Sequence, residues 1–159
     1  MNLWLITVNY GDTAPTESLI QSLIACSLPE SLKVAIADNA CSTETTSKLN
    51  NLSDSFKLNM DIFPFNENRY YWPAAKRVLS NLKASSIDYP DWEMVCNNDI
   101  TFPDKDFFKK LIKIDPIKFP IIGPQILNDT NESLNPFMTE SLSWRERLYW
   151  WLYFISYSG

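Results

Sequence analysis

A polar cluster after a short apolar run holds the residue types best suited to chemistry. Residues 94–96 are apolar, as in a central strand, and Asn97, Asn98 and Asp99 come directly after them. In open α/β sheets, ligands bind just outside the carboxyl ends of the strands. A carboxylate beside two amides suits a hard divalent cation that carries phosphates, because such ions take oxygen ligands and only one or two from the protein. The alternative is an ordinary turn without an ion, since Asn and Asp are common turn formers.

Two other predicted strands end in polar residues. Residues 3–8 form an apolar run that ends in Asn9 and Tyr10, and residues 32–37 form a second run that ends in Asp38 and Asn39. The carboxyl ends of parallel strands lie at one edge of a sheet, so these groups are expected close to residues 97–99. Their convergence favours a binding site over an isolated turn.

The elements that position these groups follow from the hydrophobic pattern. Helices are predicted where apolar residues recur at helical spacing, and strands where short apolar runs end in turn residues. The predicted strands cover residues 3–8, 32–37, 58–65 and 92–96, with an edge strand at 119–127; the predicted helices cover 16–27, 44–52, 72–84 and 104–114. This alternation predicts an α/β fold with a mainly parallel sheet and helices on both faces.

Composition excludes several classes of function. The chain has 159 residues, a net charge of −5 and no histidine. The negative charge disfavours nucleic acid as a partner, because phosphate backbones attract basic surfaces. The lack of histidine excludes a Ser-His-Asp triad and a histidine-based zinc site. Neither a GxGxxG dinucleotide motif nor a P-loop is present.

The cysteines and the apolar runs indicate a compartment. Three cysteines far apart, at positions 26, 41 and 96, form no paired motif and fit a reducing cytosol. No apolar run approaches the roughly 20 residues of a membrane-spanning helix. No signal peptide opens the chain. A cytoplasmic protein, in peripheral contact with the inner face of the membrane at most, is therefore expected.

Several stretches taken together resemble a known family. They read LITVNY at residues 5–10, VAIADNACS at 34–42, VCNNDI at 95–100 and IGPQIL at 122–127, and residues 68–77 match as well. The chain resembles the N-terminal, nucleotide-sugar-binding part of a family 2 glycosyltransferase. The resemblance covers most of residues 3–137 and implies the Rossmann-like GT-A fold. It therefore divides the chain into a nucleotide-sugar-binding core at 1–137 and an aromatic C-terminal segment at 138–159.

The resemblance also implies roles for individual residues. Val8 and Tyr10 would line the base pocket, and Asp38 would accept a hydrogen bond from a uracil or thymine base. Asn68 would lie in the loop that closes over the nucleotide. At the third strand end, Asn97 and its neighbour Asn98 would bind the nucleotide sugar, Asn97 at the ribose or diphosphate, and Asp99 would bind Mn²⁺ or Mg²⁺.

The loop after Asn68 departs from the family pattern. It reads RYYWPAAK over residues 69–76, where the family carries glycines that let a ligand approach the backbone closely. Lys76 and Arg77 have two interpretations, either contact with the diphosphate or a solvent-exposed helix face.

The implied reaction is inverting, metal-dependent transfer of a sugar. The donor would be a UDP- or dTDP-sugar and the acceptor a hydroxyl of a glycan or lipid-linked glycan, in bacterial surface-polysaccharide synthesis. In the family, the carboxylate that acts as general base lies in the C-terminal half, beyond the part that this sequence matches. Whether the chain is truncated or is a naturally short protein, it is expected to bind donor with little or no transfer. The alternatives are a non-catalytic assembly module on the same fold, and a nucleotidyltransferase. The second is disfavoured because no glycine-rich basic loop follows the first strand.

The aromatic stretch at residues 144–157 has two interpretations. Basic residues followed by Trp and Tyr are typical of an interfacial helix at a membrane surface. The favoured alternative is a helix that packs against the missing half of the protein. Left bare, such an aromatic face would promote formation of a homodimer.

Overall fold

The computed structural model describes residues 2–128, 130–134, 143–145 and 147–149. The chain divides into two compact units, Met1–Pro120 and Ile121–Gly159. The first unit holds the sheet and its helices and is described here. The boundary predicted after residue 137 falls between residues 135 and 142, outside the described residues.

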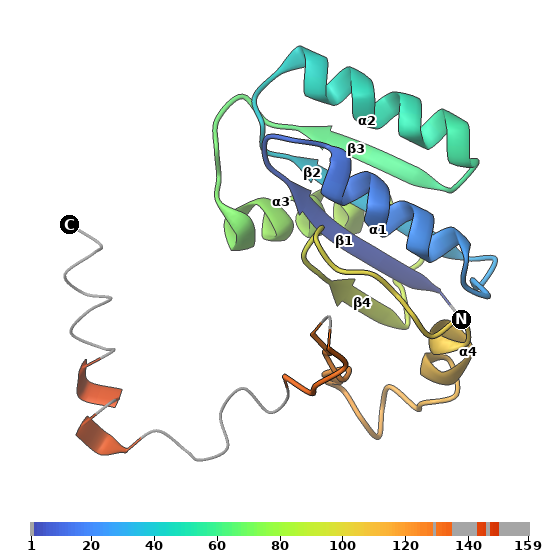
Figure 1. Cartoon of the computed structure of the whole chain (residues 1–159), viewed down its shortest axis with the longest axis vertical. Coiled ribbons are helices and arrows are strands. Elements are labelled where there is room, and N and C mark those ends of the chain that lie inside the picture. Colours follow the sequence, from blue (N-terminus) through green and yellow to red (C-terminus); the bar gives the residue numbers. More distant parts are fainter. Residues whose placement is uncertain (1, 129, 135–142, 146, 150–159) are drawn as a thin grey trace. The chain divides into compact units, whose positions relative to one another are not determined.

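A four-stranded parallel sheet forms the centre of the first unit (Figure 1). Its strand order is β3-β2-β1-β4, and every neighbouring pair is parallel. The strands are β1 (Leu3–Asn9), β2 (Leu32–Asp38), β3 (Met60–Pro64) and β4 (Trp92–Val95). The prediction of a mainly parallel sheet is confirmed.

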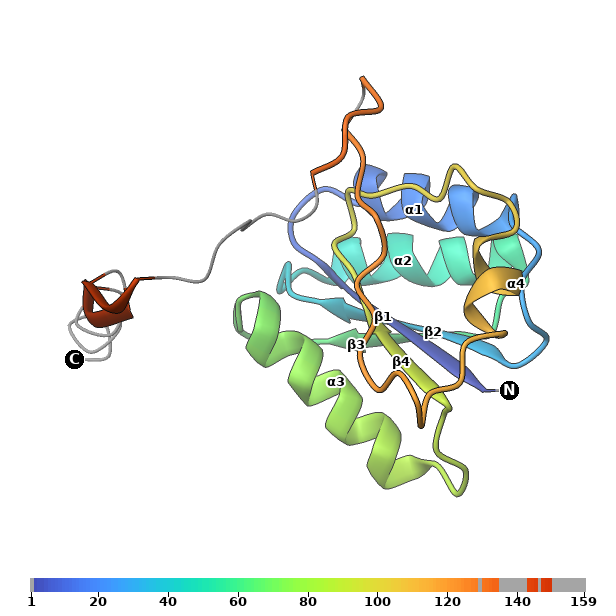
Figure 2. The same ribbon diagram turned by 90° about the horizontal axis from the view of Figure 1, so that it is seen from below.

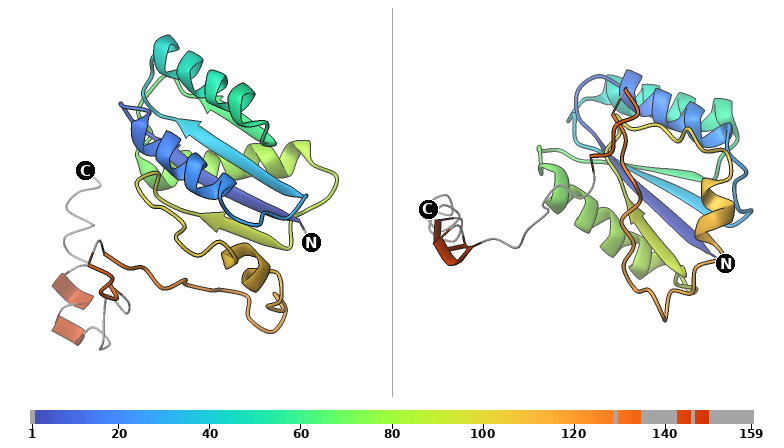
Figure 3. Two further views of the ribbon diagram at one scale, coloured as in Figure 1. Left: turned by 45° about the vertical axis from the view of Figure 1, so that its right-hand side comes forward. Right: turned by 60° about the horizontal axis from the view of Figure 1, so that its bottom comes forward.

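The helices cover both faces of the sheet, as predicted. Figure 2 shows α1 and α2 on one face and α3 on the other. Their bounds are α1 (Ala14–Ile24), α2 (Thr43–Phe56), α3 (Tyr71–Ser85) and α4 (Phe107–Leu111). The short α4 lies near the edge at which the strands begin (Figure 3), away from the strand ends that carry the polar clusters.

Side-chain alternation divides the core into two halves. In β1, Trp4, Ile6 and Val8 belong to the buried cluster that α3 covers, together with Val78 and Leu82 of that helix. Successive side chains of a strand point to opposite faces, so the odd-numbered residues of β1 point toward α1 and α2. The same rule decides which polar side chain at a strand end lies on which face.

The predicted helix at 104–114 is shorter in the structure. Asp104 accepts a hydrogen bond from the backbone N–H of Asp106 at 3.0 Å, so these residues form a local turn before α4 begins at Phe107. Such side-chain-to-backbone bonds compete with the first helical turn. At the other end, the N–H of Ile114 bonds to the carbonyl of Leu111 at 3.0 Å, which is the tighter pattern of a terminating helix.

The edge strand predicted for residues 119–127 is wrong. Within the described residues, this segment has only an isolated bridge between Leu127 and Ser133. Pro120 and Pro124 supply the physical reason, since each lacks the N–H that a ladder needs and each fixes its own backbone angle.

The aromatic segment lies largely outside the described residues, which include only 143–145 and 147–149 of this part. Trp144 and Tyr149 are exposed there. In the part of the chain that the structure describes, no helix is both long and apolar enough to cross a bilayer. Both interpretations of the segment stay predictions.

A matched pair of isoleucines tests the core. Ile36 in β2 is fully buried, whereas Ile87 is 97% exposed in the turn before β4. Ile36→Ala leaves a cavity and should lower the free energy of unfolding by about 3 kcal/mol. Ile87→Ala should change it by less than about 0.5 kcal/mol. Urea denaturation of both variants measures this difference, and equal effects would contradict the described core.

Candidate functional site

A hollow of about 440 Å³ lies at the carboxyl ends of β1, β2 and β4, beside the start of α3. It brings together six of the eight residues predicted to bind the nucleotide sugar and metal. Those that line it as predicted are Val8, Tyr10, Asn68, Asn97, Asn98 and Asp99; the hollow is also lined by Asn39, Tyr70 and Tyr71. Asp38 and Lys76 are not among the lining residues.

Strand register explains why distant residues converge here. In the ladder of β1 and β2, Asn9 lies opposite Asp38, so these two strands end together. On the other side of β1, the N–H of Cys96 bonds to the carbonyl of Ile6 at 3.0 Å, which continues the pairing one residue beyond β4. Residues 97–99 therefore leave the sheet beside the end of β1.

Asp38 has a structural role at the opposite face. Its carboxylate is buried and accepts hydrogen bonds from the Thr46 hydroxyl at 2.6 Å and from the Ala40 N–H at 3.2 Å. Thr46 belongs to α2, whereas the hollow shares the α3 side of the sheet with Val8. The Asp38 side chain thus links the end of β2 to α2, and the structure does not bring it into the hollow.

Asn39 lines the hollow, as expected from its place at the end of the second strand, although the resemblance implied no binding role for it. It is 1% exposed, and both ends of its side-chain amide are bonded. Its Nδ2 donates to Asn68 Oδ1 at 2.8 Å and to the Tyr70 carbonyl at 3.2 Å, while its Oδ1 accepts from the Arg69 N–H at 2.9 Å. Asn39 therefore fixes the loop of residues 68–70 against the end of β2.

A second polar link holds the loop of residues 97–99. The Thr16 hydroxyl, fully buried in α1, donates to Asn9 Oδ1 at 2.7 Å and accepts from Asn98 Nδ2 at 3.0 Å. One hydroxyl thus joins the end of β1, the first turn of α1 and the residue next to Asp99. Thr16 is a positioning residue that the pattern of the sequence did not reveal.

The lining carries a single formally charged side chain among the described residues, the exposed carboxylate of Asp99. Lys76 and Arg77 are exposed on α3 and lie outside the lining. The guanidinium of Arg69 pairs with Glu67 at 2.7 Å and lies 5.5 Å from the centre of the Phe65 ring. No basic side chain of the described residues therefore offsets the charge of Asp99 within the hollow.

Tyr71 adds a hydroxyl donor to the hollow. Burial, together with the neighbouring Cys96 and Asp99, raises the pKa of Tyr71 to about 12. The phenol therefore stays protonated across the neutral range and can donate a hydrogen bond to an anionic ligand.

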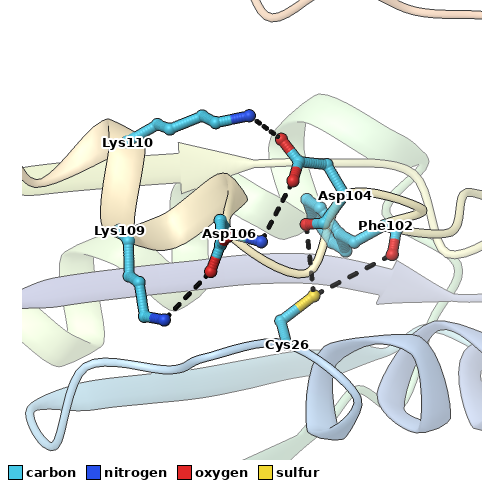
Figure 4. A network of polar contacts seen from close by, with 6 residues as sticks. All are labelled: Cys26, Phe102, Asp104, Asp106, Lys109 and Lys110. Carbon is cyan, nitrogen blue, oxygen red and sulfur yellow. Dashed lines mark hydrogen bonds and ion pairs between the residues drawn. The ribbon is translucent and has the colours of Figure 1, made fainter.

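The three cysteines differ in exposure: Cys26 is buried and Cys96 is half-buried. Cys26 follows α1, and its Sγ lies 3.7 Å from the Asp104 carbonyl and 3.9 Å from that of Phe102 (Figure 4). Burial raises the pKa of the Cys26 thiol, and burial raises that of Cys96 to about 12. Cys41 is exposed. The Cys26 contacts fasten the end of α1 to the loop before α4, at the edge of the sheet away from the hollow.

A cation held by several acidic or thiol side chains is not indicated. Within the described ranges, no three Cys, Asp, Glu or His side chains cluster closely enough to hold a metal. Asp99 with the amide oxygens of Asn97 and Asn98 is nevertheless a donor set that fits Mg²⁺ or Mn²⁺, because such ions take one or two carboxylates and complete their shell with water and phosphate.

Solved structures share the fold of this chain. A mannosyltransferase from Pyrobaculum calidifontis, in complex with GDP-Man and Mn²⁺, matches with a TM-score of 0.60 and 17% identity, over 70% of this chain and 31% of that chain. Residues 1–349 of S. aureus TarS match with a TM-score of 0.55 and 21% identity, over 71% of this chain and 32% of that chain. The complex of that protein with UDP-GlcNAc matches at 0.52 and 18% identity, over 71% and 30%.

These matches confirm the fold that the resemblance implied, a Rossmann-like α/β fold that solved glycosyltransferases share. This chain spans about a third of the length of these three solved chains, and 19% of a longer TarS chain. No family model matches the sequence, and no curated protein matches it either.

Removing the Thr16 hydroxyl tests the link between α1 and the loop. Thr16→Val keeps the shape but leaves Asn9 Oδ1 and Asn98 Nδ2 without their partner, so the free energy of unfolding should fall by about 2 kcal/mol. Thr16→Ser keeps the hydroxyl, so its free energy of unfolding should fall clearly less than that of Thr16→Val. Urea denaturation compares the two variants, and equal losses would show that the hydrogen bonds contribute nothing.

The cysteines should differ in reactivity with iodoacetamide. The thiolate is the nucleophile, so the raised pKa values of Cys26 and Cys96 keep both thiols protonated and slow at neutral pH. Exposed Cys41 should react at least about tenfold faster. Mass spectrometry of the digested protein measures this, and Cys96 should gain reactivity only as the pH rises toward 12. Equal labelling of Cys41 and Cys96 at neutral pH would contradict the burial.

Proposed function

We propose that this chain is the donor-binding part of a glycosyltransferase and binds a nucleoside-diphosphate sugar in the hollow. The observation that carries the proposal is the convergence of Val8, Tyr10 and Asn97–Asp99 at the carboxyl edge of a parallel sheet. Ligands of open α/β sheets bind at this edge. The fold shared with a GDP-Man complex and a UDP-GlcNAc complex supports the same class of ligand.

The charge of the hollow supports a metal-dependent mode of binding. A diphosphate that entered it would meet the carboxylate of Asp99 and no basic side chain of the described lining. Two anions at short distance repel each other unless a cation lies between them. We therefore assign Mn²⁺ or Mg²⁺ to Asp99, with Asn97 and Asn98 as neighbouring polar groups. When bound, this ion neutralises the diphosphate that departs with the nucleotide.

The remaining lining residues have distinct tasks in this proposal. Val8 and Tyr10 provide an apolar and aromatic wall for the base, as the resemblance implies. Asn68 holds the loop that borders the nucleotide, through its bond with Asn39. The neutral phenol of Tyr71 lies close enough to Asp99 to be influenced by its charge and can donate to a phosphate oxygen. Asp38 contributes indirectly, since its bond with Thr46 holds the end of β2 against α2.

The finer features of the reaction rest on the resemblance. We propose inverting transfer from a UDP- or dTDP-sugar to a hydroxyl of a glycan or lipid-linked glycan, within surface-polysaccharide synthesis. In this proposal, the described residues of the hollow contact the nucleotide-sugar donor or the metal, and none of them is assigned to the acceptor.

Calorimetric titration tests the donor site. UDP should bind more tightly with Mn²⁺ than without it, because the ion joins the diphosphate to Asp99. Asp99→Asn should weaken the metal-dependent binding at least about tenfold, which corresponds to about 1.4 kcal/mol. Asp88→Asn is the matched control, since this exposed carboxylate lies in the turn before β4, at the opposite edge of the sheet.

Two outcomes would contradict the proposal. Equal affinity for UDP with and without Mn²⁺ would contradict the proposed role of the metal. If the protein bound none of UDP, dTDP and GDP, the proposed donor site would be contradicted. The alternative of a non-catalytic assembly module on the same fold would then be favoured.

A further inference from the structure

Tyr70 has an unusual backbone conformation. Its φ is 58° and its ψ is −175°, directly before the first residue of α3. This combination belongs to a region that only glycine enters without strain, because a Cβ clashes with the neighbouring peptide groups. A tyrosine at such a position is a local cost to the folded protein, and it persists only where the surrounding structure imposes it.

Two asparagines impose this conformation. The N–H of Tyr70 donates to Asn68 Oδ1 at 2.8 Å, and the carbonyl of Tyr70 accepts from Asn39 Nδ2 at 3.2 Å. The same Nδ2 donates to Asn68 Oδ1, so the two amides also bind each other. Both peptide groups of Tyr70 are therefore fixed by side chains, one of which is almost completely buried.

The ring of Tyr70 gains little from the folded protein itself. Tyr70 is 76% exposed, although it lines the hollow. Burial of an aromatic ring in a core could offset a strained backbone, but that compensation is missing here. The backbone of Tyr70 is fixed, while its ring is uncovered and borders the hollow. The ring is therefore available to pack against a flat group of a bound ligand.

The position of Tyr70 indicates which part of the ligand its ring would contact. Asn39 ties Tyr70 to the end of β2, next to β1, which contains Val8 and is followed by Tyr10. Asp38, the residue expected to read the edge of the base, is engaged with Thr46 at the other face. Tyr10 and Tyr70 both line the hollow, so Tyr70 adds a second aromatic side chain to the part where the resemblance places the base.

We propose that Tyr70 is a specificity-determining residue whose ring stacks on the heterocyclic base of a nucleoside diphosphate. Asn39 and Asn68 act as positioning residues, since they hold the backbone that directs the ring. This inference rests on the proposed function and deepens it. Stacking depends on the flat face that every base has, so the site distinguishes nucleotides from simple phosphates more strongly than one base from another.

Titration of two Tyr70 variants tests the role of the ring. The probes are UDP, GDP and inorganic pyrophosphate, each with Mn²⁺. Tyr70→Gly should weaken the binding of UDP and of GDP about tenfold, as expected for the loss of one stacking partner. Pyrophosphate binding should stay unchanged, because it has no base. Tyr70→Phe should bind all three like the wild type. Tyr89→Ala, at a tyrosine that is 63% exposed outside the lining, is the control and should change nothing.

The glycine variant also reports on the backbone. Glycine suits a φ of 58°, so Tyr70→Gly should fold and should have a thermal midpoint at least equal to that of the wild type. A weaker binding of UDP by an equally stable variant, with unchanged binding of pyrophosphate, would then reflect the loss of the ring. A clear fall of the midpoint would overturn the assignment of strain and with it the argument for a functional ring.

Other outcomes separate this proposal from the donor site as a whole. Unchanged or tighter UDP binding by Tyr70→Gly would show that the ring is idle or obstructs the hollow, and would overturn the role of Tyr70 while the donor site stands. An equal loss of UDP and pyrophosphate would show that Tyr70 only shapes the loop. A wild-type protein that binds neither UDP nor GDP would overturn both proposals together.

Discussion

The site depends on the alternation of side chains at the end of β2. Asp38 and Asn39 are neighbours in sequence, and an extended backbone directs them to opposite faces of the sheet. Asp38 turns toward α2 and bonds to Thr46, whereas Asn39 turns toward the hollow and bonds to Asn68 and the Tyr70 carbonyl. One β-strand end thereby supports the helix on one side and the ligand loop on the other. A shift of one residue in the register of β2 would exchange these roles and dismantle both.

The strength of the hydrophobic pattern decided how much could be predicted from the sequence. The four parallel strands and α1, α2 and α3 followed from apolar runs and helical spacing, because burial sets both. Predictions failed where a local effect overrode the pattern. The side chain of Asp104 made a turn in place of a helical start, and two prolines prevented a strand at 119–127.

The site was predictable to the extent that residue type indicates chemistry. Polar groups after apolar runs pointed to Asn97–Asp99, and the resemblance added Val8, Tyr10 and Asn68. The contributions of Asn39, Thr16 and Tyr70 could not be predicted in the same way. Each depends on a hydrogen bond to a residue distant in sequence or on a backbone angle, and neither is a property of the residue alone.

The hydroxyl of Thr16 has a further consequence for motion within the unit. It connects residue 98 to α1 through a buried side chain, without passing through the backbone ladder of the sheet. A ligand that orders the loop of residues 97–99 would therefore also restrain the first turn of α1. The amide protons of that turn would then exchange with solvent more slowly. Ligand binding would in this way change the dynamics of a helix that does not line the pocket.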